Sequence, residues 1–192
     1  MNQDEYFSVH AGLTINVEPL PPGAGVPEML AFQQEIPPLF RIASECSSLD
    51  EGLEHSLSQL NKDEFKALAN YLTAQNNKIN LLLSFVLAQQ DDAELRFITH
   101  TFGASQLSYF SPVALTEGDN VRLKLFLDTP AAAVYAYAEV TECQTLQDGR
   151  YEITLRYVCL LEDDRDLLIR AALYFQQKIL RQRAQQRSDN KS

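Results

Sequence analysis

The second half of the chain alternates between apolar and polar residues with the period of a β-strand. In 120–127, for example, Val121, Leu123 and Leu125 alternate with Arg122 and Lys124. This period places one set of side chains in a core and the other in water. Turn-forming residues separate such segments. Short antiparallel strands over about 70 residues predict a small β-barrel, with strands at 94–102, 105–111, 120–127, 133–144 and 150–160.

The first fifty residues contain a shorter β pattern. Residues 6–20 are rich in β-branched and aromatic residues and predict one bent strand or a hairpin, interrupted near Ala11-Gly12. Prolines and glycines after Pro19 then end regular structure. Short helical pieces are expected at 27–36 and 39–46.

The longest helical signal lies between about Asp50 and Gln90, where no proline occurs and the only glycine is Gly52. Within this stretch, a second helix start capped near Asn61 could interrupt the helix. Spacings of three and four residues keep one seam on a single helix face. Two glutamines interrupt this seam, and polar seam residues specify register and partner number in coiled coils. The seam comprises Phe65, Leu68, Leu72, Gln75, Ile79, Leu82, Val86 and Gln89.

Two interpretations of this helix remain open: it packs against its own domain, or it assembles copies of the chain. A helix of about 27 residues spans about 40 Å, whereas a domain of about 100 residues has a radius of gyration near 13 Å. The helix would overshoot such a domain, which favours assembly. A second apolar line, Leu81, Leu83 and Phe85, predicts packing on two surfaces.

A final helix is predicted after Glu162-Asp163-Asp164, because acidic residues stabilise a helix N-terminus. Leu167, Leu168, Ala171, Ala172, Phe175 and Ile179 then recur at helical spacing. We therefore expect four regions. These are an N-terminal β and short-helix region at 1–49, the long helix at 50–92, a barrel with its helix at 93–185, and a disordered basic tail at 186–192.

The charge distribution argues against a nucleic-acid partner. The 192 residues include 26 acidic and 16 basic side chains, a net charge of −10. Residues 176–192 contain five of the basic residues and only one acidic residue, so the rest of the chain is strongly acidic. Phosphate binding needs clustered Lys and Arg, and the basic end has a simpler explanation in the helix dipole.

Catalytic and metal chemistry have little support. Cys46, Cys143 and Cys159 lie far apart with no C-x-x-C spacing, so neither a disulfide nor a zinc site is expected. No phosphate loop, H-E-x-x-H or G-x-S-x-G motif occurs, so an enzyme such as a hydrolase is not expected. The acidic start lacks signal-peptide features and no apolar run could span a membrane, which predicts a cytoplasmic protein.

The stretch from Phe110 to Gln177 resembles a PilZ domain in the order of its pieces. These are a SPVAL-x-x-GD turn, a strand ending in A-x-V-x-x-C, a DGRY-x-I-x-L-x-Y strand, and EDDRDLLIR opening a helix. The resemblance covers roughly 93–180. It implies an α+β protein with a six-stranded antiparallel barrel and a C-terminal helix, preceded by the heptad helix and the N-terminal β segment. Many members of the family are receptors for cyclic di-GMP.

The family's nucleotide-binding motifs do not match here. One motif is Arg-x-x-x-Arg before the first barrel strand, where Arg96 stands alone. The other is Asp/Asn-x-Ser-x-x-Gly, whose positions are occupied by Thr101, Gly103 and Gln106. Paired guanidinium groups bind phosphate and guanine edges, and the one pair at that spacing is Arg183 and Arg187 in the tail. A divergent site would have to combine these six residues.

The region before the barrel resembles divergent PilZ proteins in which a long heptad helix forms an oligomer, in at least some cases a tetramer. The resemblance implies a regulatory adaptor without a cofactor, acting on an unidentified protein partner in bacterial cyclic di-GMP signalling. Control of motility, biofilm formation or virulence would be its output. The expected homo-oligomer interface is Phe65, Leu68, Leu72, Gln75, Ile79, Leu82 and Val86. The alternative is a cyclic di-GMP receptor with the divergent site.

Overall fold

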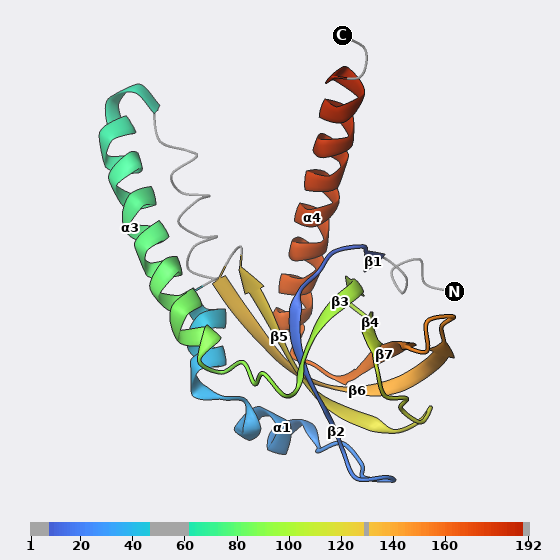
Figure 1. Cartoon of the computed structure of the whole chain (residues 1–192). Coiled ribbons are helices and arrows are strands. Elements are labelled where there is room, and N and C mark those ends of the chain that lie inside the picture. Colours follow the sequence, from blue (N-terminus) through green and yellow to red (C-terminus); the bar gives the residue numbers. More distant parts are fainter. Residues whose placement is uncertain (1–7, 47–61, 129–130, 190–192) are drawn as a thin grey trace.

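A closed antiparallel β-barrel forms the centre of the molecule (Figure 1). The computed structural model describes residues 8–46, 62–128 and 131–189, with side chains excluded at 62–65 and 187–189. The strand order is β1-β3-β2-β5-β6-β7-β4, and a β3–β4 pairing closes a ring of six. The strands are β1 (Ser8–Val9), β2 (Thr14–Pro19), β3 (Arg96–Gly103), β4 (Gln106–Ser111), β5 (Asn120–Asp128), β6 (Ala131–Thr145) and β7 (Tyr151–Cys159).

The expected α+β fold is confirmed, and strand periodicity explains its core. In β5 the residues at one parity are buried and those at the other are partly exposed. The inward side chains of the strands form one continuous apolar cluster, which includes Ile15, Leu123, Val134 and Leu155. Gly149 has a φ of 82° in the β6–β7 turn, a backbone conformation that glycine adopts at little cost.

The sixth barrel strand comes from the N-terminal region. From the sequence, residues 1–49 stand ahead of a barrel that begins near residue 93. In the structure, β2 lies between β3 and β5, with Ile15 opposite Phe97 on one side and Leu125 on the other. The backbone N–H and C=O groups along the edge of a strand need hydrogen-bond partners. β2 provides these partners for both β3 and β5 and so closes the gap between them. The barrel therefore includes residues on both sides of the long helix.

A second apolar cluster covers the outer face of β6. Helix α1 (Met29–Glu35) and the helical segment 38–46 contribute Phe32 and Phe40, which contact Tyr135 across ring-centroid distances of 5.9 and 6.5 Å. Both faces of β6 are consequently buried over most of its length. The outward tyrosines of this strand, Tyr135 and Tyr137, are covered by the chain's own N-terminal region.

Two long helices extend from the barrel, α3 (Lys62–Ala88) and α4 (Glu162–Asp189). Figure 1 shows them projecting in the same general direction. The expected start of the long helix at residue 50 lies outside the described residues. Of the tail expected to be disordered at 186–192, residues 186–189 continue α4, and the remainder lies outside the described residues. Ala184, Gln185 and Gln186 are strong helix formers and prolong α4.

Candidate functional site

The long helix α3 packs on its own barrel through one narrow face near its C-terminal end. Leu83 and Leu87 are 9% and 3% exposed and join the cluster with Phe32, Phe40 and Tyr135. They lie four residues apart, so they occupy the same side of the helix. This contact settles the first interpretation in part, because α3 does pack against its own domain.

A polar clasp fixes the point where α3 leaves the barrel. Asn16 in β2 is 2% exposed, and its side-chain amide donates to Asp91 Oδ1 at 2.8 Å and to the Asp92 carbonyl at 3.0 Å. The Asp92 backbone N–H donates back to Asn16 Oδ1 at 2.9 Å. A buried amide with all these bonds formed is stabilising, whereas losing one partner leaves an unsatisfied group. The clasp therefore ties the segment that follows α3 to β2.

The predicted seam of α3 lies mostly in solvent. Leu68, Ile79, Leu82 and Val86 are 49%, 54%, 66% and 37% exposed, and Leu72 and Gln75 are half-buried. Three further apolar side chains, Tyr71, Leu81 and Phe85, are exposed beside them. Phe65 falls among the residues whose side chains are not described. At about 100° per residue, the seam is centred roughly a quarter turn from Leu83 and Leu87.

Gln75 is held within the helix rather than by another element. Its side-chain amide donates to the Tyr71 hydroxyl at 2.8 Å. An i, i+4 pair of this kind lies along the same face of a helix. The polar interruption is therefore ordered within the exposed face, where register-specifying residues lie in helical bundles.

The six residues of the divergent nucleotide site are not gathered. Arg96 begins β3 and Gly103 ends it, about 23 Å apart at roughly 3.3 Å per residue. The Arg96 guanidinium bonds Asp91 Oδ2 at 2.7 Å. Arg183 lies on α4 beyond Ile179, the last residue packed on the barrel core, and the Arg187 side chain is outside the described set.

The remaining three of these residues have structural partners on the β3–β4 hairpin. The Thr101 and Ser108 hydroxyls bond each other at 2.9 Å. Gly103 pairs with Ser8 of β1, and Gln106 faces Arg156 of β7. These three residues are close together, and Arg96 lies at the opposite end of β3 from them.

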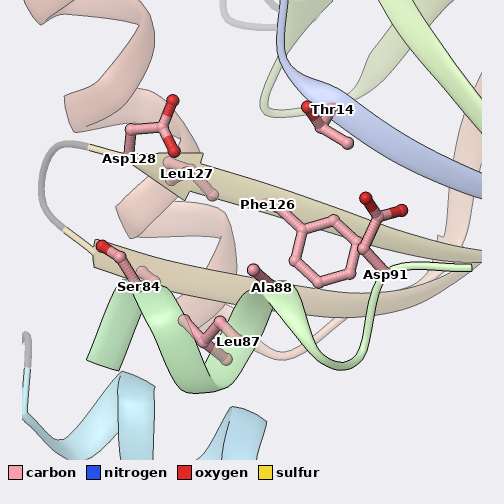
Figure 2. Close-up of a pocket in the computed structure, with 9 residues that line it drawn as sticks. Thr14, Ser84, Leu87, Ala88, Asp91, Phe126, Leu127 and Asp128 are labelled. Carbon is pink, nitrogen blue, oxygen red and sulfur yellow. The ribbon is translucent and has the colours of Figure 1, made fainter. Parts of the chain in front are cut away.

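A small pocket lies between the C-terminal end of α3 and the barrel (Figure 2). Its volume is about 110 Å³, well below the roughly 300–1,000 Å³ of sites for organic ligands. Asp91, its most buried carboxylate, already accepts bonds from Asn16 and Arg96. The pocket is thus a gap beside the clasp, lined by Thr14, Ser84, Leu87, Ala88, Asp91, Phe126, Leu127, Asp128 and Ala132.

Two buried ionisable groups lie at the base of α4. Asp164 is 4% exposed, and burial together with the nearby Asp163 raises its pKa to about 7, against a hydrogen bond from Ser44 that lowers it. Burial also raises the pKa of Tyr157, whose hydroxyl is the one buried side-chain polar atom in the described residues without a hydrogen-bond partner. Among residues 8–46, 62–128 and 131–189, no three His, Cys, Asp or Glu side chains could hold a metal ion.

Solved structures resemble this arrangement. A Xanthomonas campestris protein, described as a pathogenic protein and a new tetrameric PilZ domain self-assembled via an unusual helical bundle, aligns with a TM-score of 0.52. The alignment has 16% identity and covers 91% of this chain and 90% of that one. The fold is that of a PilZ domain. No family model matches the PilZ-like chain, and no curated protein matches its sequence.

The inhibitor of motility MotI/DgrA from Bacillus subtilis also aligns, with 10% identity and a TM-score of 0.49. The alignment covers 93% of this chain but 53% of that protein, so the chain spans about half its length. In the described part of the PilZ-like chain, no helix is long and apolar enough to cross a membrane.

Sequence reasoning found the exposed seam but missed how α3 is held. The heptad spacing was a direct signal for the seam. Nothing in the sequence marked Asn16 as a clasp, because its partners Asp91 and Asp92 lie 75 and 76 residues away. Its contacts depend on β2 entering the barrel.

Proposed function

We propose that this protein is a non-enzymatic regulatory adaptor that assembles with copies of itself through the exposed seam of α3. Its partner would be another protein in bacterial cyclic di-GMP signalling, with motility, biofilm formation or virulence as the output. The protein would not clamp the nucleotide by the family's usual motifs. The observation that carries the proposal is the seam itself, an apolar stripe that its own barrel leaves uncovered.

Burial energetics support self-assembly. Covering a large apolar side chain contributes about 1.5–3 kcal/mol relative to leaving it in water. Ile79 and Leu82 are 54% and 66% exposed, and several neighbours along the same stripe share this property. Large apolar patches on soluble domains typically mark interaction sites. The tetrameric Xanthomonas protein of similar fold offers a precedent for a helical bundle.

The positions of the arginines support the absence of a nucleotide clamp. Arg96 is engaged by Asp91, and Arg183 lies beyond the part of α4 that contacts the barrel. A bound dinucleotide needs cationic groups that converge on its phosphates.

The seam is tested by the double variant Ile79→Asp/Leu82→Asp, which introduces two charges on well-exposed positions. We expect a smaller particle mass by light scattering, with unchanged far-ultraviolet circular dichroism. The matched control is Leu30→Asp/Ile42→Asp, which changes exposed residues outside α3 and should keep the parent mass. A parent mass retained by the α3 variant would refute the assembly.

The nucleotide alternative is tested by calorimetry with cyclic di-GMP. We expect no binding heat at micromolar nucleotide. Heat that disappears in both Arg96→Ala and Arg183→Ala chains would instead establish a receptor with a divergent site.

A further inference from the structure

Helix α4 also has one face packed on the barrel and one face left in solvent. Leu167, Leu168, Ala171 and Ala172 lie in the barrel core. On the opposite side, Ile169, Leu173 and Leu180 are 38%, 44% and 56% exposed. With Gln176, they recur at spacings of four, three and four, which form a second heptad stripe. Figure 1 shows the second half of α4 extending beyond the barrel.

The charges on this stripe change sign along the helix. Glu162 and Asp166 precede the apolar residues and are exposed, with the Glu162 side chain at 83%. Arg183 follows them and is also exposed. At about 100° per residue, all three lie within roughly 60° of the apolar residues. Arg165 lies at the same angle as Arg183. Its guanidinium donates to the Ala104 carbonyl at 2.7 Å and lies 3.7 Å from Glu162. Apart from Arg165, which is held in this way, the face reads acidic, apolar, basic from its N-terminal to its C-terminal end.

Such a face is complementary to itself only when two copies run in opposite directions. In a parallel pair, acids would meet acids and arginines would meet arginines, which is unfavourable. In an antiparallel pair, the acidic end of each helix meets the basic end of the other, and the helix dipoles also favour this direction. An anionic surface such as a membrane would instead require a face that is basic throughout.

The heptad spacing defines one register for the pair. Each heptad contributes two seam positions, a and d. In an antiparallel coiled coil, an a residue of one helix lies opposite a d residue of the other. With Ile169 against the partner's Leu180, Leu173 lies beside the partner's Gln176. The same register brings Asp166 opposite the partner's Arg183. Leu173–Gln176 layers beside the axis, Ile169–Leu180 layers outside them and a charge pair at each end thus arise from a single alignment.

We propose that α4 pairs antiparallel with the α4 of a second copy of this chain across a two-fold axis near Tyr174 and Phe175. This interface is separate from the seam of α3. Two different two-fold interfaces on one chain close into a four-copy assembly when their axes are perpendicular and intersect. The step from pair to tetramer rests on the assembly through α3 proposed above, whereas the α4 pair does not.

Charge reversal tests the pair in the full chain. An Asp166→Arg chain carries arginine at both charged seam positions, so two such copies repel each other. An Arg183→Asp chain carries aspartate at both, with the same result. We expect each variant alone to have half the parent mass by sedimentation equilibrium. Mixing the two should restore the parent mass, since every cross-pair then joins opposite charges.

The control is Arg181→Asp, an exposed arginine about 100° away from the stripe, which should keep the parent mass. Circular dichroism verifies that each variant folds. Parent mass in both reversed variants, or a mixture that stays at the reduced mass, overturns the pair. A loss confined to Arg183→Asp also overturns it, because an anionic partner would need only the basic end. The Ile79→Asp/Leu82→Asp chain separately reports on α3.

Discussion

Helices α3 and α4 have nearly equal lengths, 27 and 28 residues, but they are attached to the barrel differently. α3 is held near its C-terminal end by Leu83, Leu87 and the Asn16 clasp. α4 is held along its first half, where Leu167 and Leu168 complete the barrel core. In both helices the remaining length presents an apolar stripe to solvent. The comparison shows that a helix can serve the fold with one face and remain available for assembly with another.

The two stripes also differ in charge. Between Leu68 and Val86 the α3 stripe carries no charged residue, and half-buried Gln75 is its one polar side chain. The stripe of α4 has Asp166 before it and Arg183 after it. An apolar stripe gains energy from burial without fixing direction, whereas terminal charges of opposite sign favour one direction. In the proposed assembly, α3 would therefore supply mainly affinity and α4 mainly orientation.

The largest expected effect is a difference in stability between removing a contact of α4 with the barrel and removing a contact of α3. Leu168→Ala removes a fully buried side chain from the barrel core and should lower the free energy of unfolding by about 2–5 kcal/mol. Leu87→Ala in α3 should act more locally, because its cluster lies outside the barrel. Chemical denaturation measures the first effect. Amide hydrogen exchange should show faster exchange in α3 with little change in the barrel strands for the second. Equal global destabilisation would contradict this difference.

The next effect concerns the base of α4 and depends on pH. Asp164 binds its proton more tightly in the folded state, where its pKa is about 7, than at the ordinary value of 3.8. Its contribution to stability is thus fully present below about pH 4 and is lost as pH rises through 7. Asp164→Asn should add about 2–4 kcal/mol at pH 8 and little at pH 4. Thermal unfolding measured at both pH values checks this.

Asp163→Asn is the matched control, because Asp163 is adjacent but exposed. Burial is the larger cause of the Asp164 shift, so the control should stabilise the protein less. An equal gain for Asp164→Asn at both pH values would show that the buried carboxyl does not ionise in this range.

The smallest expected effect is a different response to salt concentration of association through the α3 stripe and through the α4 stripe. Between about 0.1 M and about 1 M salt the Debye length falls from about 10 Å to about 3 Å. Association through α4, isolated in the Ile79→Asp/Leu82→Asp chain, should weaken a few-fold, as expected for exposed charge pairs worth about 0–1 kcal/mol. Association through α3, isolated in the Arg183→Asp chain, should hold or strengthen. The dissociation constants come from sedimentation at each salt concentration. Identical salt responses would remove the assigned difference between the helices.

Local patterns predicted much of this protein. Strict alternation located β5, and turn residues such as Asp148-Gly149 located the ends of hairpins, because both depend on neighbours in sequence. The seam of α3 was also readable, since spacings of three and four define one helix face. The stripe of α4 carries the same signal in Ile169, Leu173 and Leu180, alongside core-facing residues that recur at similar spacings.

By itself, the amino-acid sequence determined the periodicity of each element and hence which residues share a face. Only the tertiary structure decided which face meets the barrel. On α3 it is the face of Leu83 and Leu87, about a quarter turn from the seam, because β2 and the Asn16 clasp set where the helix exits. Likewise, β2 became a barrel strand through pairing with residues more than 75 positions away. Contacts at such separations follow from the closed sheet and leave no local pattern in the chain.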